Sequence, residues 1–193
     1  MAKYSTRKNP HGLILLSDLD HSGSSGGFNV HGVFSADFRN YITYFALSND
    51  RDSNQLTMSL KDSSNNADNT NGNYRYAFDG WYSSNSEVHH ETASEDRFKT
   101  PVIGGGDTNT AERRSITLSG TIQWMNPQTV SNHCHLIINM QAKNDSDVLY
   151  AMSGCWEYKT AGNQIYGFGV SPSANYLNTY NFKTYGIPES MSE

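Results

Sequence analysis

Apolar and polar residues alternate with a period of two through most of this chain, and this pattern most restricts what it can fold into. In residues 56–60 and 134–140 every second side chain is apolar, and residues 74–78 and 116–124 share the pattern. Successive side chains of a strand point to opposite faces, so this alternation predicts β-strands with one buried face. No stretch has the spacing of an amphipathic helix.

Turn-forming residues separate these segments. They include SNDRDSN after Leu47, DSSNNADNTNGN after Lys61 and the Asn-Pro pair at 126–127. Further strands are expected at residues 149–158, 165–170 and 180–187. Short strands separated by such turns are typical of antiparallel sandwiches and barrels. We therefore predict an all-β protein, an antiparallel β-sandwich of jelly-roll type with an N-terminal arm.

Composition narrows the class of protein. The chain has 193 residues, of which 36% are hydrophobic, 12% aromatic and only 17% charged. This length predicts one domain, and the aromatic content argues against wholesale disorder. A net charge of −5 gives no general attraction to nucleic acid, so no nucleic-acid partner is expected. The apolar run at 13–16 is too short for a membrane span, so no membrane insertion is expected.

The first 27 residues differ from the rest and predict an arm and linker. A basic head is followed by a short apolar run, and HSGSSGG at 21–27 has the composition of a flexible linker. We expect the arm to anchor the protein to neighbouring subunits, residues 28–187 to fold independently as the sandwich, and 188–193 to form a tail. The assembly residues of the arm are Lys3, Arg7, Lys8, Leu13, Ile14, Leu15 and Leu16.

Two groups of residues raise the question of a metal. His133 and His135 share one face of a predicted strand, and the His89–His90 pair could supply a third ligand from a loop. The Asp/Asn-rich residues 62–73 offer oxygen atoms to calcium but lack the EF-hand spacing. A solvent-facing strand and a long hairpin loop explain both patterns as well, so no metal or cofactor is assigned.

Catalytic motifs are absent from the sequence. It has no nucleophile elbow, no HExxH, no phosphate loop and no dinucleotide fingerprint. A pair of glycosidase carboxylates would come from distant strands and leaves no local pattern. We therefore expect a protein that is not an enzyme, with no catalytic residues. Cys134 and Cys155 are expected to be reduced, buried and not bonded to each other, as in a protein assembled in a cytoplasm.

Aromatic residues could form a platform that stacks on sugar rings. Trp124 alternates in phase with Ile122, so a place in the core is expected for it. Trp81 follows an Asp-Gly pair, where a loop tip would expose it. The residues considered for contact with a glycan or a partner are Trp81, Tyr82 and Tyr176.

The order of motifs along the chain resembles a known family. LILLSDL precedes a Ser/Gly stretch, FNVHGVFSADFRNYITYFAL and LTMSL follow, SGTIQWMNP lies in the middle, and NTYNFKTYGI comes near the end. This pattern resembles small virion structural proteins of marine and cyanobacterial bacteriophages, often labelled tail-fibre or structural proteins. The matching positions are Tyr41 and Tyr44, the segment 120–127, and Tyr185 to Ile187. They imply a fold and a virion context, and no catalytic residue.

The resemblance implies a structural protein on the exterior of a phage particle, assembled in the host cytoplasm. The expected function is a capsid decoration or cement protein anchored by its N-terminal arm. The alternative is a tail-fibre or tail-tip module that binds host surface glycans. Other capsid or tail subunits are the expected partners, and a homo-oligomer is expected, with a trimer favoured because capsids and fibres both use threefold symmetry.

Overall fold

The computed structural model describes residues 12–49, 55–82, 87–100, 116–129, 133–143, 149–160, 163–172 and 177–188. These residues contain strands and no helix, so none of them belongs to a helix that could cross a membrane. The strands are β1 (Ile14–Ser25), β2 (Phe28–Val30), β3 (Asn40–Asn49), β4 (Leu56–Lys61), β5 (Tyr74–Tyr82), β6 (Glu87–Glu95), β7 (Phe98–Lys99), β8 (Ile116–Met125), β9 (Cys134–Lys143), β10 (Leu149–Tyr158), β11 (Gly167–Pro172) and β12 (Leu177–Ile187).

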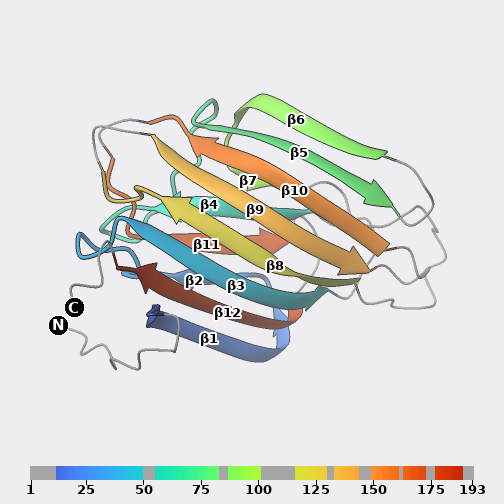
Figure 1. The fold of residues 1–193 in the computed structure, drawn as a ribbon, viewed down its shortest axis with the longest axis horizontal. Helices are drawn as coiled ribbons and strands as arrows, with labels where there is room; N and C mark the ends of the chain where they lie inside the picture. The colour runs from blue at the N-terminus through green and yellow to red at the C-terminus, as the bar shows by residue number, and fades with distance from the viewer. Residues whose placement is uncertain are drawn as a thin grey trace.

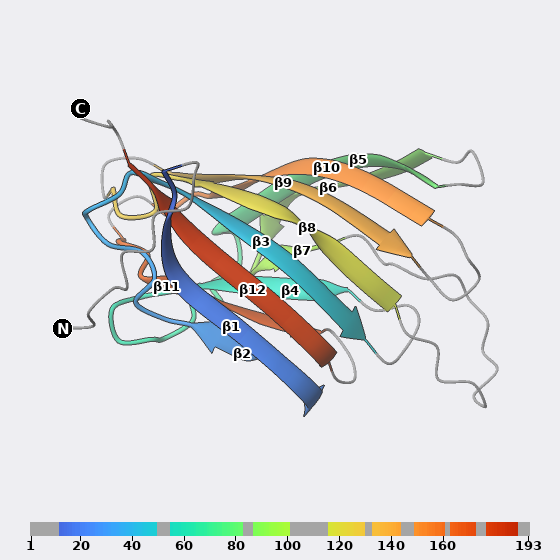
Figure 2. The same cartoon turned by 60° about the horizontal axis from the view of Figure 1, so that its bottom comes forward.

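Two sheets of unequal size pack face to face. The larger sheet has eight strands in the order β1-β12-β3-β8-β9-β10-β5-β6, and the smaller has four in the order β2-β11-β4-β7. Figure 1 shows the large sheet from β6 at the top to β1 at the bottom, and Figure 2 shows the small sheet beneath it. The paired strands run antiparallel, so the predicted all-β antiparallel β-sandwich is confirmed.

The described part of the expected arm and linker is not separate from the domain. Residues 14–25 form β1, which pairs with β12 from Ile14 opposite Gly186 to Ser25 opposite Leu177. Leu16 and Leu19 are partly buried against the core. The linker prediction at 21–27 was wrong because strand pairing satisfies the backbone of a Ser/Gly-rich segment whatever its side chains. The basic head, Lys3, Arg7 and Lys8, and the tail from 189 lie outside the described residues.

Strand β6 was also not predicted. Its sequence EVHHETASE has no apolar alternation, and the histidine pair was expected in a loop. It pairs with β5 at the edge of the large sheet, where none of the other described strands lies on its second side. Charged side chains on an edge strand discourage pairing with other molecules, which is consistent with this composition.

The core lies between the sheets and contains two groups of aromatic rings. In one group Trp124 of the large sheet stacks on Phe168 of the small sheet, with ring centroids 5.0 Å apart, and Phe34 lies 4.8 Å from Trp124. In the other group Trp156 stacks on Phe98 at 4.7 Å. Trp124 is fully buried, as its phase with Ile122 predicts.

Polar groups inside the core are hydrogen-bonded to one another. The Trp124 indole N–H donates to Thr43 Oγ1 at 2.9 Å, and the hydroxyls of Thr43 and Thr184 are also 2.9 Å apart. Both threonines are fully buried. A buried hydroxyl without a partner would cost about 1–3 kcal/mol, so this chain of hydrogen bonds lets three neighbouring strands carry polar atoms inside the core.

The Asp/Asn-rich loop at 62–73 uses its carboxylates to hold its own turns. Asp62 Oδ1 accepts hydrogen bonds from the backbone N–H groups of Ser64 and Asn66. Asp68 accepts from Thr70 N–H, and the Tyr158 hydroxyl also donates to it. The hydrogen bond from Asn66 N–H is the main cause that lowers the pKa of Asp62. These contacts explain the loop composition without a calcium ion.

Candidate functional site

The solvent-facing side of the large sheet carries most of the candidate residues. We call the outward-pointing side chains of β8, β9, β10, β5 and β6 the outer face. Antiparallel register places them in rows that cross the strands. One row contains Ser119, Gln141, Ala151, Trp81 and Glu87. The next contains Thr121, Asn139, Ser153, Asp79 and His89.

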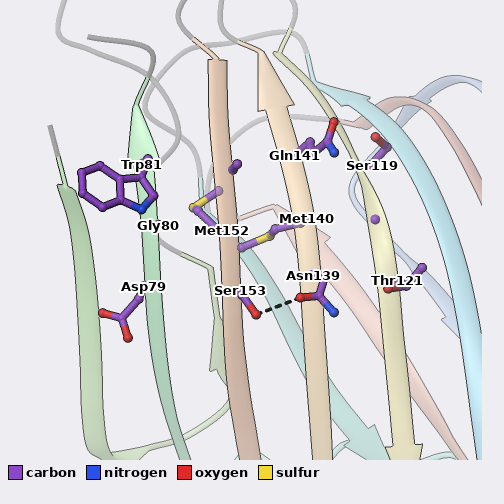
Figure 3. A pocket seen from close by; sticks show the side chains of 12 residues that line it. Asp79, Gly80, Trp81, Ser119, Thr121, Asn139, Met140, Gln141, Met152 and Ser153 are labelled. Atoms are coloured by element: carbon purple, nitrogen blue, oxygen red, sulfur yellow. Dashed lines mark hydrogen bonds between the residues drawn. The ribbon is translucent and has the colours of Figure 1, made fainter. Parts of the chain in front are cut away.

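These two rows enclose a hollow of about 620 Å³ that is open to solvent. Figure 3 shows Trp81 and Asp79 on one side of it, and Ser119 and Thr121 on the other. The hollow exists because its middle carries short side chains, Ala151 and Ser153 among them, while the Trp81 ring stands at its side. The Trp81 side chain is 59% exposed, although it belongs to a strand and not to the loop tip that the sequence predicted.

Two glycines lie in the floor of this hollow, where neighbouring strands approach closely. A Cβ atom at Gly120 would overlap the carbonyl oxygen of Asn139, and one at Gly80 would overlap that of Ala151. Any larger residue there would push strands apart beneath the hollow. The close approach of neighbouring strands at Gly80 and Gly120 therefore helps to set the shape of the hollow.

The hollow offers uncharged hydrogen-bonding groups next to the indole ring of Trp81. Its lining includes hydroxyl groups from Ser119, Thr121 and Ser153 and the amides of Asn139 and Gln141. Ser153 Oγ donates to Asn139 Oδ1 at 2.8 Å, which holds these two side chains against each other (Figure 3). Among the described residues that line the hollow, Asp79 is the charged one, and no lysine or arginine is present.

His89 lies between two carboxylates at the β6 side of this hollow. Its Nδ1 is 2.7 Å from Asp79 Oδ1, and its Nε2 is 3.6 Å from Glu91 Oε2. The hydrogen bond to Asp79 is the main cause that raises the pKa of His89, and the negative charges of both carboxylates add to it. A protonated His89 therefore neutralises part of the acidic charge on this edge below its pKa.

We expect the His89 imidazole to titrate above the usual histidine value of about 6.5. In Asp79→Asn the titration midpoint should fall towards that value, because the main partner of the protonated ring is gone. In the wild type, the stability that the His89–Asp79 pair contributes is present below the pKa of His89 in the unfolded chain. It is lost as the pH rises through the higher pKa of His89 in the folded protein. NMR titration of the ring protons measures both midpoints, with Glu91→Gln as the weaker control. Equal midpoints in wild type and Asp79→Asn would contradict this assignment.

A second hollow, of about 870 Å³, lies next to the first on the same face. Its middle is more apolar, with Ile137, Cys155 and Ala77 side by side across β9, β10 and β5. Arg75 and His133 both contact Glu157 at its end, the histidine through Nδ1 at 2.6 Å. Burial by itself would raise the pKa of Glu157, but the hydrogen bonds from Arg75 and His133 bring it below its usual value.

The histidine clusters do not converge on one point. His89 and His90 are adjacent in β6, so His89 points outward while His90 lies beside the ring of Tyr76, with centroids 5.4 Å apart. His133 and His135 share the outer face with ring centroids 6.4 Å apart, and His133 is engaged by Glu157. In the part of the chain that the structure describes, no three His, Cys, Asp or Glu side chains form a possible metal site.

The two cysteines differ from each other. Both are free, as expected, and Cys134 is buried, with burial raising the pKa of its thiol. Cys155 is exposed on the outer face, so the prediction that it is buried was wrong. Its position in β10 is in phase with Ser153, and residues in that phase point to solvent.

The remaining predicted contact residues are only partly placed. The backbone of Tyr82 ends β5, its side chain is not described, and Tyr176 lies outside the described residues. Of the predicted arm residues, Leu13 directly precedes β1, and Ile14, Leu15 and Leu16 lie in it. Sequence reasoning missed Asp79, Asn139, Gln141 and Ser153 because hydroxyl, amide and carboxyl side chains on an outward strand face look like any solvated surface.

Comparisons with known proteins add little. No family model matches the chain, and no curated protein does. A solved structure of the marine PL-14 alginate lyase from Aplysia kurodai covers 92% of this chain and 85% of its own, with 11% identity and a TM-score of 0.26. The infectious bursal disease virus VP2 subviral particle covers 92% of this chain and 41% of its own, with 12% identity and a TM-score of 0.15. Likenesses this weak carry no argument about function.

Proposed function

We propose that this protein is a non-enzymatic, glycan-binding β-sandwich displayed on the exterior of a phage particle, as a tail-fibre or tail-tip module would be. The single observation that carries the glycan-binding part is the first hollow, where an exposed Trp81 ring borders a floor of hydroxyl and amide groups. Tryptophan rings stack on the apolar faces of sugars, and hydroxyls and amides can both donate to and accept from sugar hydroxyls.

The charge of the hollow favours neutral sugars. Above the pKa of His89, where that ring is neutral, Asp79 would repel the carboxylate of a uronic acid, and the described residues that line the hollow include no lysine or arginine. An extended neutral chain also suits an open, shallow hollow better than a small charged molecule, which would need more enclosure.

Binding without catalysis is the better fit to the carboxylates of the outer face. A glycosidase acid needs a raised pKa and a buried setting. Glu157 is the buried carboxyl of this face, and its pKa lies below the usual value because Arg75 and His133 hold it ionised. Asp79 and Glu91, in contrast, are exposed to solvent.

The virion context rests on the sequence resemblance described above. The hypothesis of a capsid decoration protein depended on residues 1–27 acting as an anchoring arm. Because β1 is paired within the chain's own large sheet, this hypothesis now depends on residues 1–11, which lie outside the described part. The hypothesis of glycan binding depends instead on the Trp81 ring and on hydroxyl and amide side chains whose positions the structure describes.

Native gel electrophoresis in gels that contain a polysaccharide tests this proposal. We expect hydroxyethylcellulose, xylan or galactomannan to retard the protein, and polygalacturonate to retard it less. Trp81→Ala should weaken binding about tenfold, because it removes the stacking ring. Tyr166→Ala is the matched control, since Tyr166 is a partly exposed ring outside the outer face.

Three outcomes would contradict the proposal. One is that none of the three neutral polysaccharides retards the protein. Another is equal retardation of the wild type and Trp81→Ala. Shortening of the polysaccharide on prolonged incubation would show that the protein is an enzyme.

A further inference from the structure

The row that contains Asp79 and Ser153 continues beyond the first hollow across the whole large sheet. Strand register extends it to β3, β12 and β1 on the far side. The members of this polar row, in order from β1 to β6, are Asp18, Lys183, Tyr44, Thr121, Asn139, Ser153, Asp79 and His89.

This polar row contains an exposed aromatic ring in addition to Trp81, which belongs to the adjacent row. Tyr44 of β3 is 45% exposed and lies directly beside Thr121 of β8. Its ring packs edge-on against Tyr185 of β12, with centroids 5.9 Å apart, which restricts the positions it can take. Tyr44 therefore presents a held aromatic ring on the same side of the sheet as Trp81.

Taking the proposed glycan binding as its basis, we infer that Tyr44 is a second stacking residue and that the bound chain crosses the strands from Trp81 to Tyr44. Three strands lie between β5 and β3, so the four steps across the sheet from Trp81 to Tyr44 add up to about 19 Å at a strand spacing of about 4.8 Å. The strand spacing of about 4.8 Å is comparable with the length of one sugar residue in an extended chain. The site would then hold about five sugar residues, one at each ring and one at each of the three strands between them.

The groups between the two rings indicate the chemical class of the sugars. Thr121, Asn139 and Ser153 are neutral and can hydrogen-bond to hydroxyl groups on successive sugars. The charged side chains of the polar row lie at its two ends. At one end Asp79 contacts His89, and at the other Lys183 Nζ is 3.4 Å from Asp18 Oδ2. The ligand class is therefore a neutral, extended oligosaccharide such as a β-1,4-linked hexose chain.

Calorimetric titration of the full chain with cello-oligosaccharides and manno-oligosaccharides of two to six units tests this inference. For at least one series we expect affinity to rise with each unit to about five and then level off. Tyr44→Ala should weaken binding of the hexasaccharide about five- to tenfold and leave that of the disaccharide nearly unchanged. Tyr44→Phe keeps the ring and should bind as the wild type does.

The outcomes separate this inference from the proposed function. If Trp81→Ala weakens binding and Tyr44→Ala does not, Tyr44 is not a contact and the inference is overturned while glycan binding stands. Affinity that levels off at the disaccharide in both series overturns it too. If neither series binds although a polysaccharide retards the protein in gels, the inferred ligand class is wrong. If nothing binds in either assay, the proposed function fails as well.

Discussion

Removal of residues 1–27 is expected to leave a chain that no longer folds cooperatively. These residues include all of β1, whose pairing extends along β12. Leu16 and Leu19 pack against the core, and the His21 ring stacks on Tyr180 with centroids 4.9 Å apart. The deletion uncovers the core side of β12 and makes it an edge strand with unpaired backbone groups.

The expected loss is large compared with the stability of a domain. Each leucine that is fully buried contributes about 1.5–3 kcal/mol, and a whole domain is stable by only about 5–15 kcal/mol. Leu16 and Leu19 are partly buried, but the deletion also removes backbone hydrogen bonds along the strand and the packing of His21. Aggregation through the new edge is therefore the expected result.

Thermal unfolding followed by circular dichroism at a β-sheet wavelength measures this effect. Removal of residues 1–11 is the matched control, because it leaves β1 and its pairing intact, and it should unfold in one cooperative transition. A synthetic peptide of residues 12–27 should restore folding to the longer deletion. If the longer deletion is soluble and unfolds cooperatively by itself, residues 1–27 act as a separable arm after all.

Trp124→Ala is expected to destabilise the protein by about 3–5 kcal/mol. The side chain is fully buried between Phe34 and Phe168, and alanine would leave a large cavity between the two sheets. The change also takes the indole N–H away from Thr43 Oγ1. Most of the expected loss comes from the cavity, because Thr43 keeps its hydrogen bond with Thr184.

Trp81→Ala provides the same substitution at an exposed site. It should change stability by less than about 0.5 kcal/mol, because most of its ring already faces solvent. Urea unfolding followed by circular dichroism compares the two variants. A similar loss in both would mean that Trp81 supports the fold, and its effect on glycan binding could not then be attributed to stacking.

Local pattern was enough to predict most of the strands. Period-two alternation depends only on which face of a strand is buried, so it was sufficient to predict strands in the segments that became β4, β5, β8 and β9, and further strands were expected at β10, β11 and β12. The burial of Trp124 follows from the same rule. The edge strand β6 could not be predicted from alternation, because it carries charged and polar residues where a central strand would have apolar ones.

The place of β1 depended on tertiary structure. The local sequence of β1, apolar at its start and rich in Ser and Gly at its end, is compatible with either an arm or a strand. Its pairing with β12 involves backbone atoms about 160 residues away along the chain. The outcome was decided by which sheet edge was available. Residues so far apart in sequence leave no local mark of their contact.

The sequence by itself therefore determined the class of fold, the buried faces of β8 and β9 and the burial of Trp124. Only the tertiary structure decided the candidate site. Trp81, Asn139 and Thr121 belong to different strands, and each is unremarkable as an outward residue of its own strand. Strand order and register bring them together in one hollow, because antiparallel pairing aligns side chains across strands regardless of their distance in sequence.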